Sequence, residues 1–186
     1  RPLSACTVPP LSLRGDLVKV REVVSSYHQE AMGTGFNLDE VDDPVSVLLF
    51  LNDLAVQGAA SGTEDRPVGN MAICSVDHPR ITEFIASKQV RRDMLWKFNI
   101  SVNTPETFWF AVQNDALWQL RNGNEVYAKE LFHLMAQSAH ACADPGIVFM
   151  DRVNRDNPVP ATGAYHSIAP CAEVGFFRTH MVRAIY

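Results

Sequence analysis

The stretch from residue 69 to residue 85, Gly-Asn-Met-Ala-Ile-Cys-Ser-Val-Asp-His-Pro-Arg-Ile-Thr-Glu-Phe-Ile, decides the fold. Residues 70–76 are a short, mostly apolar run of the kind that forms a buried strand. A helix then starts at His78-Pro79, and its apolar residues recur at helical spacing. A buried strand followed directly by an amphipathic helix is typical of α/β proteins with parallel strands.

The same alternation of strands and helices extends to both sides of this stretch. Apolar runs and alternating patterns predict strands at residues 3–8, 97–103 and 147–150, the last of them fully apolar and buried. Helical periodicity and start signals predict helices at residues 16–31, 44–58 and 125–142. Thr104, with Pro105 after it, is predicted to cap one more helix, and residues 151–163 are predicted to be loop. We therefore expect an α/β fold with largely parallel strands and flanking helices.

The amino-acid composition limits which class of protein this chain can belong to. The chain has 186 residues, enough for one domain with a sizeable core, and its 47% apolar content is typical of a globular protein. A net charge of −5 provides no basic field for nucleic acid. No apolar run approaches the roughly 20 residues that span a bilayer, and no secretory signal is visible, so we expect a cytoplasmic protein without membrane or nucleic-acid partners.

The four cysteines, Cys6, Cys74, Cys142 and Cys171, are widely spaced. They form no CxxC pair, so a zinc ribbon or a thioredoxin-like motif is not indicated, and they are too few for a disulfide scaffold. For Cys74 and Cys142 we favour the interpretation that they are buried as small apolar residues. His133 and His140 lie seven residues apart on a predicted helix, which is a weak pattern for a metal site.

The segment Ala169-Pro170-Cys171-Ala172-Glu173 places a thiol two residues before a carboxylate. In an extended segment these two side chains point to the same face. A nearby carboxylate disfavours the thiolate, so a conventional nucleophile fits poorly, and two groups that act on different atoms of one substrate fit better. The alternative is a buried cysteine beside a solvated glutamate. A cysteine hydrolase would need a basic partner near Cys171, and the sequence identifies none.

The glycines of Gly33-Thr34-Gly35-Phe36-Asn37 mark a close backbone approach or a positive φ. A plain turn between a helix and a strand explains this segment as well as a substrate contact does.

Several motifs in one order resemble the catalytic α/β barrel of ribonucleotide reductases, most closely the adenosylcobalamin-dependent class. They are Arg1-Pro2-Leu3-Ser4-Ala5-Cys6, Gly33-Thr34-Gly35-Phe36-Asn37, Gly69-Asn70-Met71 with Val76-Asp77-His78-Pro79, Phe98-Asn99-Ile100-Ser101-Val102, Pro145-Gly146-Ile147-Val148-Phe149 with Asp151-Arg152-Val153-Asn154, and Pro170-Cys171-Ala172-Glu173. The resemblance implies a partial catalytic barrel over residues 1–175 and a tail, 176–186, that does not look like the family.

The resemblance also implies roles for single residues. Cys171 matches the cysteine that becomes a thiyl radical and abstracts the ribose 3′ hydrogen, and Glu173 matches the carboxylate that takes the 3′-hydroxyl proton. Cys6 matches one of the two cysteines that reduce the 2′ position. Further positions match substrate contacts: Ala5, Gly33, Ala169, Pro170 and Ala172.

Cofactors and partners follow from the same resemblance. It implies adenosylcobalamin as the radical source, a dithiol reductant such as thioredoxin, and a ribonucleoside di- or triphosphate as the substrate, with deoxyribonucleotides for DNA synthesis as the product. It also implies a deoxynucleotide effector, although the loop between Asn37 and Pro44 is short where relatives carry a long effector-binding loop. Half of a barrel has open strand edges, so we expect a partner chain or self-association to complete it.

Two departures separate this chain from the family's pattern. Ala169 stands where the family usually has an asparagine that holds the substrate hydroxyl, and no cysteine follows Gly175 to act as the partner of Cys6. These departures keep an alternative open, namely a non-catalytic nucleotide-binding or assembly subunit that retains the reductase fold.

Overall fold

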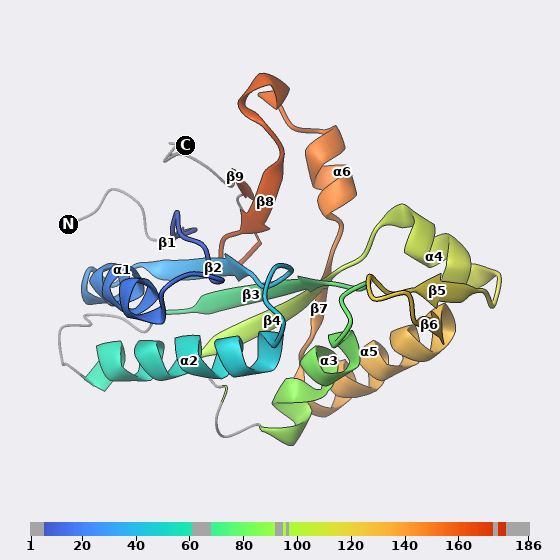
Figure 1. Ribbon diagram of the computed structural model, residues 1–186, viewed down its shortest axis with the longest axis horizontal. Helices are drawn as coiled ribbons and strands as arrows, with labels where there is room; N and C mark the ends of the chain where they lie inside the picture. The colour runs from blue at the N-terminus through green and yellow to red at the C-terminus, as the bar shows by residue number, and fades with distance from the viewer. Residues whose placement is uncertain (1–5, 61–67, 92–94, 96, 173–174, 178–186) are drawn as a thin grey trace.

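The computed structural model describes residues 6–60, 68–91, 95, 97–172 and 175–177. Its centre is a five-stranded sheet in which every neighbouring pair is parallel, in the order β1-β2-β3-β4-β7 (Figure 1). The strands are β1 (Cys6–Thr7), β2 (Gly33–Asn37), β3 (Asn70–Ser75), β4 (Phe98–Asn103) and β7 (Gly146–Val148). The predicted α/β fold with parallel strands is confirmed.

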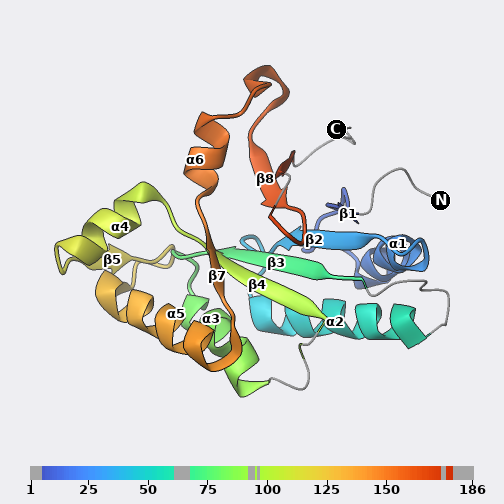
Figure 2. The same cartoon turned by 180° about the vertical axis from the view of Figure 1, so that it is seen from behind.

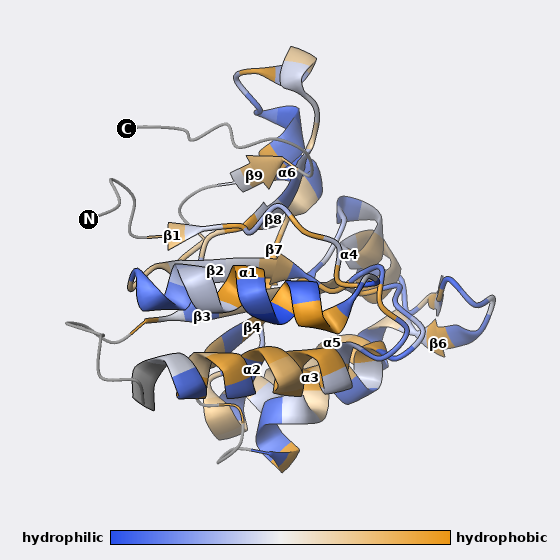
Figure 3. Ribbon diagram, turned by 60° about the vertical axis from the view of Figure 1, so that its left-hand side comes forward, coloured by the Kyte–Doolittle hydropathy of each residue, from blue (hydrophilic) through white to orange (hydrophobic). Residues whose placement is uncertain are grey.

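Five helices accompany this sheet: four of them cover one of its faces, and α4 lies beyond the end of the sheet, packed against α5 (Figure 1). They are α1 (Leu17–Gln29), α2 (Pro44–Ala60), α3 (Ile81–Val90), α4 (Glu106–Gln113) and α5 (Ala128–Cys142). Their apolar sides and the sheet residues beneath them form the main core, in which Leu48, Phe84 and Ile100 are fully buried. The longest of the five, α2, is apolar along most of its length (Figure 3). None of the helices in the described ranges is both long and apolar enough to cross a membrane.

The opposite face, here called the open face, carries Gly33 and Gly35 of β2 and Met71 and Ile73 of β3. The chain returns across it through α6 (Met150–Arg155), a 3-10 turn (Pro160–Thr162) and the antiparallel pair β8 (Tyr165–Ile168) and β9 (Gly175–Phe177) (Figure 2). A second, small cluster forms there, in which the side chains of β3 pack against Met150 and Ile168. Helices cover one face of the sheet, and a single returning segment covers part of the other.

Local capping explains why the early helices start where they do. The Asp16 carboxylate accepts a hydrogen bond from the Val18 amide at 2.8 Å and so caps α1. The Asp43 carboxylate accepts from the amide of Ser46 at 3.0 Å and from its hydroxyl at 2.8 Å, and Pro44 takes the first helical position of α2. Both helix starts agree with the sequence prediction.

The region between β4 and α5 differs from the prediction. Thr104 does not cap α4, because its hydroxyl accepts a hydrogen bond from the Trp109 indole at 3.0 Å; the amide of Glu106 instead bonds the carboxylate of Asp151 at 2.8 Å. A hairpin of β5 (Leu117–Gln119) and β6 (Glu125–Tyr127) was not predicted, and it takes three residues assigned to the start of α5.

Two predictions after α5 were also wrong. Residues 147–150 were expected to be buried, but β7 is the last strand of the sheet and Ile147 is 37% exposed; only Met150, which starts α6, is buried. The predicted loop over residues 151–163 contains most of the short helix α6, whose six residues are too few for helical spacing to be recognised.

Candidate active site

Cys6 and Gly33 lie side by side at the amino ends of β1 and β2, where they are direct partners in the parallel register. A Cβ atom on Gly33 would lie 3.2 Å from Sγ of Cys6 and 3.0 Å from Cγ of Pro170. The sulfur of Cys6 and the ring of Pro170 are therefore within about 6.2 Å of each other. Glycine at position 33 lets segments from opposite ends of the chain meet at one point on the open face.

The segment that carries Cys171 reaches this point because β8 crosses β2 at very short range. A Cβ atom on Gly35 would lie only 1.9 Å from the carbonyl oxygen of Ile168. Two residues further along β2, the side-chain amide of Asn37 donates to the carbonyl oxygen of His166 at 2.7 Å. Gly35 permits the crossing and Asn37 fixes its register. Gly35, the second glycine of the 33–37 motif, therefore allows the backbones of β2 and β8 to come into contact.

Cys171 itself lies in a turn. The amide of Ala172 donates to the carbonyl oxygen of Ala169 at 2.9 Å, which closes a four-residue turn with Pro170 and Cys171 in the middle. Cys171 is exposed, Ala169 is fully buried, and Ala172 has a φ of 59°, a left-handed conformation that is unfavourable for a residue with a side chain. The premise of an extended segment was therefore wrong for residues 169–172.

The amino end of β2 is held from the helix-covered face by a buried polar network. The side-chain oxygen of Asn70 accepts from the amide of Thr34 at 3.1 Å and from its hydroxyl at 2.7 Å, while the amide group of Asn70 donates to the carbonyl oxygen of Lys97 at 3.1 Å. Nε2 of His28 lies 3.2 Å from both Thr34 and Asn70, and burial lowers the pKa of His28. This network fixes Thr34, the residue after Gly33, against β3, and neither Thr34 nor His28 was singled out from the sequence.

A second polar network joins the carboxyl ends of three strands. The Asp39 carboxylate accepts from the hydroxyl of Ser75 at 2.8 Å, and the side chain of Asn103 donates to that hydroxyl at 3.1 Å. The guanidinium of Arg121, from the hairpin region, lies 3.3 Å from the Asp39 carboxylate and 2.8 Å from that of Asp77. These contacts fix the end of the sheet that lies away from Cys6.

The remaining cysteines lie away from Cys6. Cys74 faces the helix-covered core, fully buried, and burial raises its pKa far above the ordinary thiol value. Cys142 ends α5, and its thiol is hydrogen-bonded to carbonyl oxygens of Ser138 and Asp144. The expectation of a buried, inert thiol is confirmed for Cys74, whereas Cys142 is only partly buried.

The structure thus brings together Cys6, Gly33 and Pro170, with Cys171 next to Pro170. Ala5 and Glu173, which were also predicted as site residues, lie outside the described residues, so their roles stay predictions. Within the described ranges, no group of three or more histidine, cysteine, aspartate or glutamate side chains could hold a metal ion, and the weak pattern of His133 and His140 gains no support.

The fold and the site define a class of α/β protein whose parallel sheet is covered by helices on one face. On the open face, Cys6 lies beside the turn that carries Cys171. Comparison with known proteins then gives the family. The family described as "Ribonucleotide reductase, barrel domain" matches residues 38–181, and the chain belongs to this family.

Curated relatives agree with this family. A vitamin B12-dependent ribonucleoside-diphosphate reductase of Thermoplasma acidophilum is 32% identical over 196 residues, covering 92% of this chain and 25% of that protein. A protein of the same description from Mycobacterium tuberculosis (strain CDC 1551) is 39% identical over 137 residues, covering 70% of this chain and 20% of its own length. A vitamin B12-dependent ribonucleotide reductase of Streptomyces coelicolor is 28% identical, covering 83% of this chain and 21% of that protein. The chain spans about a fifth to a quarter of these relatives.

Proposed function

We propose that this chain provides part of the catalytic barrel of a ribonucleotide reductase and acts in the radical reduction of ribonucleotides to 2′-deoxyribonucleotides. The observation that carries the proposal is the meeting of Cys6 and the Cys171 turn at Gly33. Family membership and the vitamin B12-dependent relatives support it. The positions of Cys171 and Cys6 support it as well, because the proposed radical thiol and the proposed reducing thiol must both reach the same ribose.

Cys171 is proposed to carry the thiyl radical that removes the 3′ hydrogen of the ribose. Its position suits this role, because it is exposed at the tip of a turn while Ala169 beneath it is buried. Glu173 is proposed to take the proton of the 3′-hydroxyl, a role that rests on its match to the family's motif. Proton transfer of this kind needs the carboxylate within hydrogen-bond reach of the hydroxyl.

Cys6 is proposed to supply one of two thiols for reduction at the 2′ carbon. In the overall reaction the 2′-hydroxyl leaves as water, hydrogen takes its place, and two thiols become one disulfide. Cys74 cannot be the second thiol, because it lies on the helix-covered face and is fully buried. We propose that an external dithiol, such as thioredoxin or dithiothreitol, provides the second thiol and the electrons for further turnovers.

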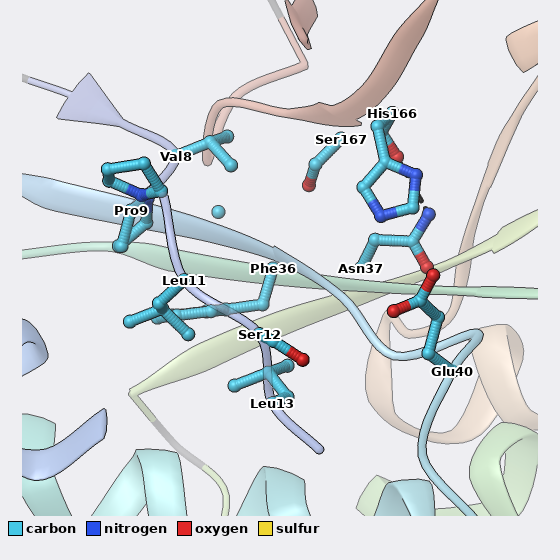
Figure 4. Close-up of a pocket in the computed structure, with 12 residues that line it drawn as sticks. Val8, Pro9, Leu11, Ser12, Leu13, Phe36, Asn37, Glu40, His166 and Ser167 are labelled. Atoms are coloured by element: carbon cyan, nitrogen blue, oxygen red, sulfur yellow. Dashed lines mark hydrogen bonds between the residues drawn. The ribbon is translucent and has the colours of Figure 1, made fainter. Parts of the chain in front are cut away.

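Adenosylcobalamin, the proposed cofactor, would supply the radical that oxidises the Cys171 thiol. The exposure of Cys171 fits a group that approaches from outside the chain. A hollow between residues 8–13, strand β2 and strand β8, with a volume of about 270 Å³ (Figure 4), is far smaller than a corrin and does not fit it. We therefore assign no described residue to hold cobalamin and derive only the roles of the thiols.

A partner chain or a second copy is proposed to cover the open face and complete the barrel. The open face is only partly covered by the returning segment, the Asn99 side chain on β4 is exposed, and Ile147 on the last strand is 37% exposed. An uncovered parallel sheet is unusual, because such sheets are normally buried on both faces. Completion of the barrel would cover these residues and complete the substrate site.

A second candidate function is a nucleotide-binding or assembly subunit without turnover. The observation that favours it is Ala169, whose methyl group is fully buried where the family usually has an asparagine. This position therefore offers no side-chain hydrogen bond to the substrate, and such a bond contributes roughly 0.5–1.5 kcal/mol when both partners are neutral.

One assay separates the two functions. The chain is incubated with adenosylcobalamin, dithiothreitol and a ribonucleoside di- or triphosphate, and deoxyribonucleotide is measured by chromatography. The test variant is Cys171→Ala, and the matched control is Cys142→Ala, a thiol on the far side of the sheet. At chain concentrations high enough for a second copy to complete the barrel, we expect product from the wild-type and control chains and none from Cys171→Ala. Turnover by Cys171→Ala would overturn the radical role, and nucleotide binding without turnover by the wild-type chain would support the second function.

A further inference from the structure

Cys171 lies in the connection between two paired strands. Strands β8 and β9 pair antiparallel, and the residues that join them in the chain, 169–174, include Cys171. At the far end of the pair, Tyr165 is the direct partner of Phe177, and their rings stack with centroids 4.6 Å apart. A Cβ atom on Gly175 would lie only 2.8 Å from Cγ of Tyr165, so the Tyr165 side chain lies against β9. The position of Tyr165 therefore sets the position of the strand pair that carries Cys171.

The side-chain amide of Asn154, on α6, bonds both backbone polar groups of Tyr165. Its Oδ1 accepts from the Tyr165 amide at 2.6 Å, and its Nδ2 donates to the Tyr165 carbonyl oxygen at 3.0 Å. Nδ2 also donates to the carbonyl oxygen of Met150 at 2.9 Å, within the same helix. Asn154 thus exchanges with Tyr165 the pair of bonds that a residue of a neighbouring strand would exchange. It fastens β8 to α6, which lies beside it (Figure 2).

These three bonds require an amide at position 154. The side chain of asparagine has two N–H donors and one acceptor oxygen, and all three are used here. Aspartate has nearly the same size, but its carboxylate has no donor and would face the two carbonyl oxygens that Asn154 now bonds. Because Asn154 is half-buried, water cannot fully replace the lost bonds.

Asn154 ends the motif Asp151-Arg152-Val153-Asn154, whose charged members contact α4. The Asp151 carboxylate accepts from the amide of Glu106, and the Arg152 guanidinium lies 3.3 Å from the Glu106 carboxylate. Asn154 is the member of the motif whose side chain reaches β8. The motif therefore joins α4 on one side to the strand pair of Cys171 on the other.

We propose that Asn154 is a positioning residue for Cys171. By fixing Tyr165 it fixes the strand pair β8–β9, and so the place at which the Cys171 turn meets Cys6 at Gly33. The position matters, because a displacement of about 1 Å at a reacting group can lower a rate about a hundredfold. The proposal rests on the proposed function for the role of Cys171, but the position of the turn can be measured without turnover.

The test variant is Asn154→Asp, and the matched control is Asn157→Asp. Asn157 is also half-buried and also bonds backbone groups through its side-chain amide. It donates to the carbonyl oxygen of Gly163 at 2.9 Å and accepts from the amide of Val159 at 2.9 Å, in the connection between α6 and β8. The control therefore makes the same chemical change to the same segment without touching Tyr165.

Two readouts are taken on the full chain. A short bifunctional methanethiosulfonate links Cys6 to Cys171, and peptide mass spectrometry gives the yield of that link in each folded chain. Turnover of the ribonucleotide with adenosylcobalamin and dithiothreitol gives kcat and KM.

We expect Asn154→Asp to lower the link yield about tenfold, the effect of losing two hydrogen bonds, and Asn157→Asp to leave it unchanged. The kcat of Asn154→Asp should fall while KM stays the same, because Asn154 acts on the position of Cys171 and not on substrate binding. An unchanged link yield in Asn154→Asp, or an equal loss in Asn157→Asp, overturns the proposal.

Two further outcomes are distinguishable. If Asn154→Asp does not fold, hydrogen exchange of the wild-type chain decides: protection of the Tyr165 amide supports the proposal, and exchange at the rate of a free amide overturns it. If the wild-type chain links Cys6 to Cys171 but shows no turnover, the proposed reaction fails, and the link yields of the two variants still test the positioning role.

Discussion

Replacement of Gly35 by alanine is the sharpest structural test of how the site is assembled. The added Cβ would lie 1.9 Å from the carbonyl oxygen of Ile168, whereas ordinary contacts begin near 3.4 Å, so β8 would have to move by about 1.5 Å. The clashing atom belongs to the backbone and cannot rotate away. Overpacking of this kind costs about 1–3 kcal/mol, and we expect Gly35→Ala to lower the free energy of unfolding by at least that amount.

The measurement is urea unfolding of the purified chain, with Gly69→Ala as the matched control. A Cβ on Gly69 would meet no atom within 4 Å, and Gly69 is not among the glycines with positive φ, so alanine there should be neutral or stabilising by about 0.4–1 kcal/mol. Equal stability of Gly35→Ala and the wild-type chain, within about 0.5 kcal/mol, would refute the close crossing of β2 by β8.

Two further predictions concern caps and pH. Asp43→Ala should lower the free energy of unfolding by about 0.5–2 kcal/mol because α2 loses its cap. Burial alone would raise the pKa of Asp43, but hydrogen bonds from Ser46 and the Arg80 guanidinium bring it from 3.8 to about 2. The contribution of the ionised Asp43 carboxylate to the free energy of unfolding is therefore complete above pH 3.8 and is lost as the pH falls toward 2. The stabilities of the wild type and of Asp43→Ala should therefore converge in acid unfolding curves, and a constant difference between them would contradict this. Burial lowers the pKa of His28 below 6.5, so the unfolded chain binds more protons and the wild type should lose stability as the pH falls below 6.5. His28→Gln should show a smaller loss over the same range in urea titrations at each pH, and an unchanged slope would show that His28 is not the group responsible.

Long, strongly patterned elements could be predicted from the sequence. The apolar run of β3 and the periodicity of α2 with its Asp43-Pro44 start each pointed to one structure, and both were confirmed. The β5–β6 hairpin was missed because each strand is only three residues long, too short for an alternating pattern to be distinguished from helix.

Caps and sites depend on tertiary contacts that the local sequence does not contain. The amide of Glu106 is capped by Asp151 and not by Thr104, because β7 brings Asp151 beside the start of α4. For the same reason, the sequence alone could mark the glycines of β2 as places of close approach but could not say that Cys6 and Pro170 meet at Gly33.

The central claim is that Cys6 and Cys171 belong to one site, and thiol cross-linking tests it most directly. The chain is treated with a short bifunctional methanethiosulfonate, and the linked residues are identified by peptide mass spectrometry. Cys74 is buried with a raised pKa and should not react in the folded chain, and Cys142 serves as the internal control. We predict an intramolecular Cys6–Cys171 link that is lost in 6 M guanidinium. Links from Cys171 to Cys142 at equal yield, or no Cys6–Cys171 link in the folded chain, would contradict the account.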